Sequence, residues 1–393
     1  MDKGFSIVCV SRQDWDVGLP TNRQQIMLRA AQRGHRVLFV ESGGHLGRHL
    51  WRLAKGPNRG SLARRLFGAE EPAESVSVEK ALTVAPWGQK FSLSNRINSR
   101  LTGLRVRKAA KRLDGPRILW LYDPTAFELV GRAGEDLTVY DVVDDYAEQV
   151  GPDERRRRFV THADEEAASR SQVVFATTRG LYERERERNP NTHLVRNGAD
   201  YAHFSAVARD EAAPEVLALP EPVVGFAGNL TAEKVDFELL EAVARARPAW
   251  SFVLVGPAVN GAQERLKGLA ALPNVHALGF RSYGDLPRYV AGFSVGLIPY
   301  RVSAYTRNCS PLKVFEYLAA GKAVVASGVP ELAGMEPDVT LAGGPDTFVS
   351  AIEAALAADG PEAVAGRRAL AAQNTWEART ERLLDLVGGR LAG

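Results

Sequence analysis

The chain has 393 residues, of which 45% are hydrophobic and 25% charged, and its formal net charge is +3 at pH 7. This is the composition of an ordinary globular protein, and it excludes a disordered, fibrous or strongly polybasic chain. The chain is longer than a typical domain with a single hydrophobic core, so we expect two domains. The two cysteines, Cys9 and Cys309, lie far apart and form neither a disulfide framework nor a metal cluster, which favours a reducing compartment.

The N-terminal stretch MDKGFSIVCVSRQDWD contains no apolar run long enough for a signal peptide. No run elsewhere approaches the roughly 18 consecutive apolar residues of a membrane span. We therefore expect a cytoplasmic protein, with peripheral contact at the inner face of a membrane left open.

Short apolar runs alternate with longer helical patterns along the chain. The runs are FSIVCV, RVLFVE, RILWLY, LTVYDVV and QVVFATT in the first half, and PVVGFAG, SFVLVG, NVHALG, SVGLIP and AVVAS in the second. Alternating strands and helices predict an α/β fold with parallel sheets that helices cover on both faces. The two series of runs predict two such sheets.

The stretch between the two series, SAVARDEAAPEVLALPEP at residues 205–222, is rich in alanine, proline and acids and shows no strand pattern. We place the domain boundary there, which gives a first domain of residues 1–204 and a second of residues 205–373. The last stretch, NTWEARTERLLDLVGG, predicts an amphipathic helix with Asn374 or Thr375 as its cap.

One segment departs from the average charge. Between Arg48 and Arg117 there are 16 lysines and arginines against 5 acids. This excess fits a solvated helix face, and it also fits a surface that meets an anionic membrane or a phosphorylated lipid. Nucleic acid would favour the same charge, but the sequence contains no nucleic-acid motif, so we expect no nucleic-acid partner.

The stretch SPLKVFEYLAAGKAVVAS, residues 310–327, predicts a helix that runs into a buried strand. Ser310 suits the N-cap, Pro311 the first helical position and Gly321 the left-handed residue that ends the helix. Lys313 would then lie near a bound diphosphate, and Glu316 could accept hydrogen bonds from a ribose diol. The same two residues also fit a plain Lys–Glu pair on the surface of a capped helix.

The stretch VVGFAGNLTAEKVDFELL, residues 223–240, predicts a strand, a glycine-containing loop and a helix. A glycine at position 228 lets the backbone approach a phosphate closely, and Lys234 could reach the same phosphate. No dinucleotide fingerprint or P-loop follows a strand, so the sequence indicates a nucleotide site without the common binding loops.

Four stretches together resemble the nucleotide-sugar half of GT-B glycosyltransferases, closest to the large family-4 group. They are VRNGADYAHF, FAGNLTAEKVDFELL, LGFRSYGDLPRYVAGFSVGLIPY and SPLKVFEYLAAGKAVVAS. The match covers residues 190–335 well, and the SPLK and EYLAAGK elements are similar to the subgroup that builds bacterial surface polysaccharides. The combination is specific, whereas no single stretch would be.

The resemblance implies two Rossmann-like domains facing across a cleft, with the donor on the second domain and the acceptor on the first. It implies that the C-terminal helix, residues 374–393, crosses back to the first domain. It further implies roles in nucleotide-sugar binding for one set of residues, which are Gly228, Asn229, Lys234, Phe280, Asn308, Ser310, Pro311, Lys313 and Glu316. The chain departs from the family pattern at two of these, because Asn308 stands where the family has a glutamate and Asn229 lies where it has an arginine.

Glycosyl transfer must stabilise the departing phosphate and, for inversion, deprotonate the acceptor hydroxyl. The lysines of the second domain suit the first task, so no metal or other cofactor is expected. For the second task, Asp144 and Asp145 follow a predicted strand of the first domain, although the pair also fits a helix cap or, less well, a metal-binding acid pair.

Two further places in the first domain are candidates for acceptor binding. Asp14 and Trp15 follow the first strand, although they also fit the packing of a loop. His45 follows the second strand in a glycine-rich setting, although it also fits an ordinary surface histidine.

The sequence therefore predicts a metal-independent glycosyltransferase. Its donor would be a nucleotide-diphosphate sugar, most simply a UDP-sugar, and its acceptor a saccharide or polyprenyl-linked saccharide of surface polysaccharide synthesis. Two other readings stay open. One is a nucleotide-sugar epimerase on the same fold, and the other is a non-catalytic protein whose basic surface binds membrane or nucleic acid.

Overall fold

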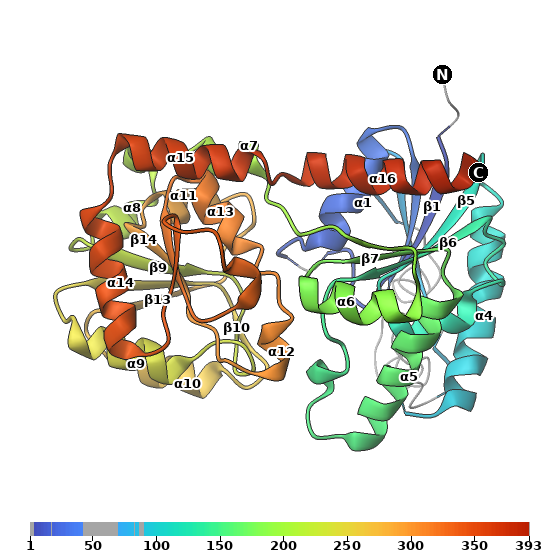
Figure 1. Cartoon of the computed structure of the whole chain (residues 1–393), viewed down its shortest axis with the longest axis horizontal. Helices are drawn as coiled ribbons and strands as arrows, with labels where there is room; N and C mark the ends of the chain where they lie inside the picture. Colours follow the sequence, from blue (N-terminus) through green and yellow to red (C-terminus); the bar gives the residue numbers. More distant parts are fainter. Residues whose placement is uncertain (1–3, 17, 42–69, 82, 86–89, 393) are drawn as a thin grey trace, which may run out of the picture. The chain divides into compact units, whose positions relative to one another are not determined.

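The computed structural model describes residues 4–16, 18–41, 70–81, 83–85 and 90–392. The chain divides into two compact units, each with its own parallel sheet (Figure 1). Unit 1 consists of Met1–Arg196 and Arg379–Gly393, and unit 2 of Asn197–Ala378. His45 and the basic stretch at residues 48–69 lie outside the described residues.

Unit 1 contains an eight-stranded sheet in the order β3-β4-β2-β1-β5-β6-β7-β8. All neighbouring pairs are parallel except β3 and β4. The strands are β1 (Ser6–Val10), β2 (Arg36–Glu41), β3 (Glu70–Ala73), β4 (Val76–Lys80), β5 (Arg117–Leu121), β6 (Leu137–Val142), β7 (Val173–Ala176) and β8 (Thr192–Leu194). The helices are α1 (Asn22–Gln32), α4 (Ser92–Ala110), α5 (Glu154–Arg170) and α6 (Arg179–Arg188), with the short 3-10 helix η1 (Pro124–Leu129).

The central strands of unit 1 are buried on both faces, as parallel sheets require. The register places β1 between two partners, with Val8 opposite Leu38 of β2 and Leu119 of β5. Aliphatic residues of these strands pack with the inner sides of α4 and α5 in one core. This core holds the carboxyl ends of β1, β5 and β6 in fixed places.

Unit 2 contains a six-stranded parallel sheet in the order β13-β11-β9-β14-β15-β16. Its strands are β9 (Val223–Ala227), β11 (Ser251–Val255), β13 (Val275–Gly279), β14 (Val295–Ile298), β15 (Ala323–Ala326) and β16 (Val339–Leu341). Its helices are α7 (Tyr201–Ser205), α8 (Pro214–Leu217), α9 (Phe237–Ala246), α10 (Gln263–Leu269), α11 (Leu286–Ala291), α12 (Ala304–Arg307), α13 (Lys313–Ala319), α14 (Pro345–Ala357) and α15 (Pro361–Ala372). A separate two-stranded ribbon pairs β10 (Leu230–Thr231) with β12 (Ala258–Val259).

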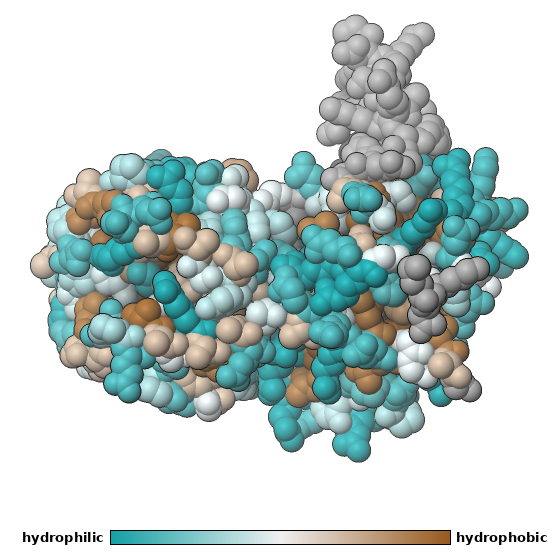
Figure 2. All heavy atoms as spheres, turned by 90° about the horizontal axis from the view of Figure 1, so that it is seen from above, coloured by the Kyte–Doolittle hydropathy of each residue, from teal (hydrophilic) through white to brown (hydrophobic). Residues whose placement is uncertain are grey.

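The last helix, α16 (Trp376–Ala392), begins in unit 2 and has most of its length in unit 1, as the predicted return of the C-terminal helix requires. The hydroxyl of Thr375 accepts a hydrogen bond from the N–H of Ala378, so Thr375 caps the helix. In the face drawn in Figure 2, hydrophilic side chains alternate with smaller hydrophobic patches.

The division between the units falls at residues 196 and 197, eight residues before the predicted boundary at 204 and 205. The side chain of Asn197 donates a hydrogen bond to the Ser310 carbonyl, and α7 packs against α11 and α13. The stretch at residues 205–222 also packs within unit 2, where Ala212 and Val216 are buried. The polar composition of this stretch therefore marks a surface connection of unit 2 rather than a linker.

Candidate functional site

The sheet of unit 2 reverses its direction of winding between β9 and β14. The chain builds outward from β9 to β11 and β13 on one side, and then returns to β14 and continues to β15 and β16 on the other. In open parallel sheets, the carboxyl ends of the strands at such a reversal form the crevice where ligands bind. The residues that follow Ala227 of β9 and Ile298 of β14 are therefore the candidates for a binding site.

Two glycines bring backbone segments close together beside this reversal. Gly228 follows β9 and Gly256 follows β11, with φ of 135° and 136°, values that residues with a side chain rarely adopt. A Cβ atom on Gly256 would lie 2.0 Å from the Gly228 carbonyl oxygen, and a Cβ on Gly228 would lie 3.2 Å from Cε of Lys313. Glycine at both positions leaves the edge of the sheet open in front of Lys313.

Lys313 is the first residue of α13 and lies directly at the reversal point. Its ammonium donates a hydrogen bond to the Tyr300 hydroxyl at 2.9 Å. It also lies 5.0 Å from the centre of the Phe226 ring and 5.2 Å from that of Tyr300. These contacts from β9 and from the segment after β14 hold a half-buried positive charge where a diphosphate could be bound.

The predicted start of this helix was wrong. The helix begins at Lys313 with Leu312 in the N-cap position, and no side chain caps it. The N–H groups of Val314 and Phe315 instead bond to the carbonyls of Pro311 and Leu312, so a tight turn of the 3-10 type precedes the helix. Ser310 and Pro311 therefore shape the approach to Lys313. The predicted left-handed residue at the other end, Gly321 with φ of 79°, is present.

Glu316 lies one turn after Lys313. Among the described residues, no hydrogen-bond donor and no ion-pairing side chain within 4 Å contacts its carboxylate. Burial raises the pKa of Glu316 to about 7, the positive charge of Lys313 opposes this rise, and the negative charge of Asp200 adds to it. A half-buried carboxylate without hydrogen-bond donors is costly unless a ligand supplies them, so Glu316 is the strongest single indication of a binding site.

Tyr317 attaches α13, the helix that carries Lys313 and Glu316, to the sheet. The Tyr317 hydroxyl accepts a hydrogen bond from the N–H of Ala227, the last residue of β9. The Tyr317 ring lies so close to Gly296 of β14 that a Cβ there would be 2.4 Å from a ring carbon. Lys313 and Glu316 therefore stand at fixed distances from the ends of β9 and β14.

Three other residues of the predicted donor set lie in the loops of unit 2. The Lys234 ammonium lies 4.8 Å from the centre of the Tyr305 ring. Asn308 ends α12, and Asn229 is an exposed residue directly after Gly228. The structure thus brings Gly228 next to Lys313, and Asn229 follows Gly228 in the chain.

Phe280 follows β13 and has a side chain that is 51% exposed. Its neighbour Arg281 is occupied within unit 2, since it donates hydrogen bonds to the Tyr289 hydroxyl and the Leu278 carbonyl and pairs with Glu215. Phe280 is therefore free to stack on a ligand, whereas Arg281 supports the loop.

In unit 1, the segment after β1 packs against β2. The N–H of Trp15 donates a hydrogen bond to Glu41 at 2.9 Å, and the Trp15 ring meets Phe39 edge to face. The side chain of Gln24 donates to the carbonyls of Asp14 and Trp15. Burial, and to a smaller extent the Glu41 charge, raise the pKa of Asp14. Trp15 is thus a packing residue of the loop, while the exposed carboxylate of Asp14 remains a candidate for acceptor binding.

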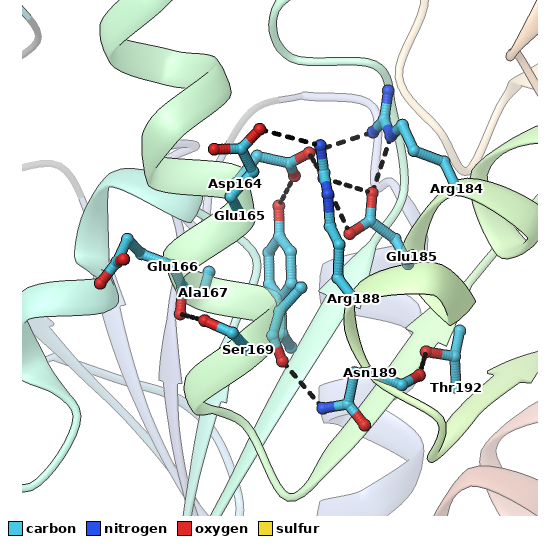
Figure 3. A network of polar contacts seen from close by, with 12 residues as sticks. Asp164, Glu165, Glu166, Ala167, Ser169, Arg184, Glu185, Arg188, Asn189 and Thr192 are labelled. Carbon is cyan, nitrogen blue, oxygen red and sulfur yellow. Dashed lines mark hydrogen bonds and ion pairs between the residues drawn. The ribbon is translucent and has the colours of Figure 1, made fainter.

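The two aspartates after β6 lie in different surroundings. Asp145 is buried and accepts a hydrogen bond from Arg184 at 2.8 Å. Arg184 also pairs with Asp164 and Glu185, and Arg188 pairs with the same two carboxylates, so that a polar network joins α5 to α6 (Figure 3). This network gives Asp145 a structural task that the sequence did not reveal.

Asp144 is half-buried and interacts electrostatically with Arg23 of α1 and with Tyr146. Arg23 is buried and donates hydrogen bonds to the Gln13 side chain and the Tyr146 hydroxyl. Burial lowers the pKa of Arg23, but Tyr146 and Asp144 outweigh it and raise that pKa above its usual value. The carboxyl edge of the unit 1 sheet thus holds a buried cation beside Asp144.

Sequence reasoning missed Arg23, Tyr146 and Tyr300. Tyr300 directly follows the predicted strand SVGLIP, so its position at a carboxyl end was a signal that could have identified it. Arg23 has no such signal, because a basic residue on a helix is normally exposed.

No described group of three or more histidine, cysteine, aspartate or glutamate side chains is arranged to hold a metal ion. None of the described helices combines the length and the apolar character that crossing a membrane demands.

The segment that contains this site is similar to known proteins. Residues 221–358 match the family model of glycosyl transferases group 1. Among curated proteins, the putative teichuronic acid biosynthesis glycosyltransferase TuaH of Bacillus subtilis (strain 168) is 28% identical over 270 residues, which cover 64% of this chain and 67% of TuaH. The matched family segment contains both strands of the reversal point, Lys313 and Glu316.

Solved structures match over nearly the whole chain. Sucrose-phosphate synthase from Thermosynechococcus elongatus has a TM-score of 0.75 at 16% identity, with 99% of each chain covered. Anabaena HepE in complex with UDP-glucose has a TM-score of 0.66 at 17% identity, with 98% of this chain and 99% of HepE covered. These likenesses confirm the predicted GT-B fold with its two Rossmann-like units.

Proposed function

We propose that this chain, whose residues 221–358 form a glycosyl transferases group 1 domain, moves a sugar from a UDP-sugar to a saccharide or lipid-linked saccharide in the synthesis of a surface polysaccharide. The observation that carries the proposal is the half-buried Glu316 carboxylate, which has no hydrogen-bond donor among the described residues and stands one turn from Lys313 at the reversal of the sheet. The HepE complex, which contains UDP-glucose, and the name of TuaH support the donor and the pathway class.

The two charged residues fit the two ends of a nucleoside diphosphate. The Lys313 ammonium can bind the diphosphate, and Glu316 can accept hydrogen bonds from the vicinal hydroxyls of the ribose. Phe280, with its exposed ring, is the proposed stacking partner of the base. Gly228 leaves room for the phosphates next to Lys313.

Transfer breaks the bond between the anomeric carbon and the diphosphate oxygen, and negative charge builds up on that oxygen. A cation already in place stabilises this charge without reorganisation, which is the effect that lowers the barrier. We propose that Lys313, with Lys234 on the neighbouring loop, supplies this stabilisation and that no divalent metal is required. Asp144 is the proposed base that takes the proton from the acceptor hydroxyl.

The first experiment is a thermal-shift measurement of the purified protein with UDP, GDP, ADP and dTDP, each in the presence of EDTA and again with Mg²⁺ or Mn²⁺. A ligand that binds only the folded state at a hundred times its Kd stabilises that state by about 2.7 kcal/mol. We expect a rise of several degrees with UDP alone, unchanged by EDTA. A rise that needs metal would overturn the metal-independent mechanism, and no rise with any nucleotide would overturn the donor site.

The second experiment separates transfer from epimerisation. The protein is incubated with UDP-sugars that stabilise it, with and without polyprenyl-diphosphate-linked saccharides, and the products are followed by mass spectrometry and NMR. Release of UDP that depends on the acceptor supports transfer. Conversion of the UDP-sugar to its epimer without an acceptor would replace the proposal by the epimerase reading.

A further inference from the structure

Large exposed hydrophobic side chains gather in one part of unit 1. Eight such side chains are found in the described residues, and five of them lie between residues 84 and 104. They are Val84, Phe91, Leu93, Ile97 and Leu104, of which Leu93 is 68% and Leu104 70% exposed. Single exposed hydrophobic residues are common, but a group on one element needs a reason.

The helix α4, which Figure 1 shows at the edge of unit 1, combines three of these residues, Leu93, Ile97 and Leu104, with positive charges. At 100° per residue, seven exposed residues from Leu93 to Lys111 fall within a stripe roughly 100° wide and about 27 Å long. The stripe, called here the α4 face, consists of Leu93, Ile97, Arg100, Leu104, Arg107, Lys108 and Lys111. The α4 face contains no acidic residue, so it is apolar and cationic at once.

The basic residues of α4 differ in whether an acid lies near them. Arg105 pairs with Glu79 at 2.7 Å and Arg96 with Glu128 at 3.4 Å, and both acids belong to the body of unit 1. Among the described residues, Arg100, Lys108 and Lys111 have no acid within ion-pairing distance. Their charge is therefore available to an anionic partner.

The mixture of side chains narrows the choice of partner. Leucine and isoleucine at these positions offer nothing to a nucleic acid, which is bound through cations, hydrogen bonds and aromatic stacking. A bilayer that contains anionic lipid takes both kinds of side chain, because the apolar ones enter the acyl boundary while lysines and arginines stay at the phosphates.

We propose that the α4 face is the surface by which this protein lies on an anionic membrane. Each basic residue close to such a surface contributes about a fivefold gain in binding, and the leucines add the gain of buried apolar area. The inference rests on the proposed function for its purpose, which is access to a lipid-linked acceptor, but the binding itself can be measured without any sugar transfer.

The test is co-sedimentation of the full chain with vesicles of phosphatidylcholine alone and with half phosphatidylglycerol, at 50 and 300 mM salt. The cation variant is Arg100→Gln/Lys108→Gln/Lys111→Gln, and the apolar variant is Leu93→Ser/Leu104→Ser. The matched controls on unit 2 are Lys267→Gln and Val302→Ser, which change exposed residues of the same kinds. Urea unfolding of every variant checks that the fold is kept.

We expect binding to the anionic vesicles only, weakened by salt. The cation variant should bind on the order of 100-fold and the apolar variant about tenfold more weakly, while the controls bind like the unchanged protein. Absence of vesicle binding, or equal losses in the controls, would overturn the proposal. If the unchanged protein binds a DNA oligomer, and the cation variant loses this binding while the apolar variant keeps it, the surface would be assigned to nucleic acid instead.

The thermal shift with UDP, measured on the same samples, keeps this inference separate from the proposed function. Vesicle binding that depends on the α4 face, together with no UDP shift, would support the membrane surface and overturn the donor site. A UDP shift with no vesicle binding would support the donor site and overturn the membrane surface.

Discussion

The ammonium of Lys313 donates its hydrogen bond to the Tyr300 hydroxyl at 2.9 Å, and this contact joins the start of α13 to the segment that follows β14. Both ring neighbours of the ammonium, Tyr300 and Phe226, leave its charge facing the edge of the sheet beside Gly228. Lys313 is thus held in place before any ligand arrives. Preorganised charge of this kind favours phosphate binding and catalysis together.

Replacement of Lys313 by methionine should weaken UDP binding by about 10- to 100-fold, because a charge-assisted hydrogen bond contributes about 1.5–3 kcal/mol. Methionine keeps the apolar contacts with Phe226 and Tyr300. Tyr300→Phe removes only the hydrogen bond to the Lys313 ammonium, so it should lower the affinity for UDP by a few-fold. Isothermal titration calorimetry with UDP and with uridine measures both effects.

Uridine is the internal control for this prediction, since it lacks the phosphates and its affinity should be unchanged in Lys313→Met. The exposed Lys267 provides the control variant Lys267→Met. An equal loss of UDP and uridine affinity would show that Lys313 supports the fold of the site and does not contact the diphosphate.

Replacement of Glu316 by glutamine should stabilise the ligand-free protein at alkaline pH. The folded pKa of about 7 lies above the ordinary value, so the folded state holds the proton more tightly than the unfolded state. The free energy of unfolding of the unchanged protein therefore falls as pH rises from about 4.5 to about 7. The glutamine variant should be more stable by about 3 kcal/mol at pH 8 and equally stable near pH 4.5.

The same variant should lose most of its UDP-induced thermal shift, because glutamine replaces one of the two accepting oxygens by an NH2 donor and removes the negative charge. Urea unfolding at pH 4.5, 6 and 8 gives the stability, with Glu264→Gln on the exposed side of α10 as the control. If the variant is less stable than the unchanged protein at pH 8, then Glu316 has a structural partner, and the assignment of its carboxylate to a ligand fails.

Asp144→Asn and Asp145→Asn should separate catalysis from stability. Asp145 is buried against Arg184, so its replacement should lower the free energy of unfolding by about 2 kcal/mol or more. Asp144→Asn should instead lower kcat by about 100-fold or more with UDP binding unchanged, as loss of a general base does. Full transfer activity in Asp144→Asn would remove it as the base.

All ten apolar runs of the sequence form strands of the two main sheets, because buried parallel strands need continuous apolar residues on both faces. The strands that the sequence did not reveal are short or lie at edges. Examples are β16 (Val339–Leu341) at one edge of its sheet and β8 (Thr192–Leu194) at the edge of the other. Such strands pair with one neighbouring strand or are buried on one face only, so their sequences show little of the continuous apolar pattern.

At the candidate site, the sequence indicated that Gly228 follows a strand and that Lys313 and Glu316 lie on one helix, and the structure has them in these positions. Their roles in binding stay predictions. The start of α13 could not be predicted, since Ser310 and Pro311 are typical of an N-cap and its first helical residue, and only tertiary contacts replace that cap by a tight turn. The Asp145–Arg184 pair also could not be predicted, because Asp145 lies in the loop after β6 and Arg184 on α6, far apart in the sequence.

Gly256→Ala should damage both the fold and the site. The new Cβ would lie 2.0 Å from the Gly228 carbonyl oxygen, and the φ of 136° is strained for alanine. The backbone after β9 would have to move, so we expect a loss of about 3 kcal/mol or more in unfolding free energy. The displaced Gly228 should also weaken UDP binding.

Gly328→Ala is the matched control, since a Cβ there would meet nothing within 4 Å. Urea unfolding and calorimetry with UDP on both variants complete the comparison. Unchanged stability in Gly256→Ala would mean that the loops after β9 and β11 can separate at little cost. The room beside Lys313 would then not depend on these two glycines, and a ligand would have to order the edge of the sheet when it binds.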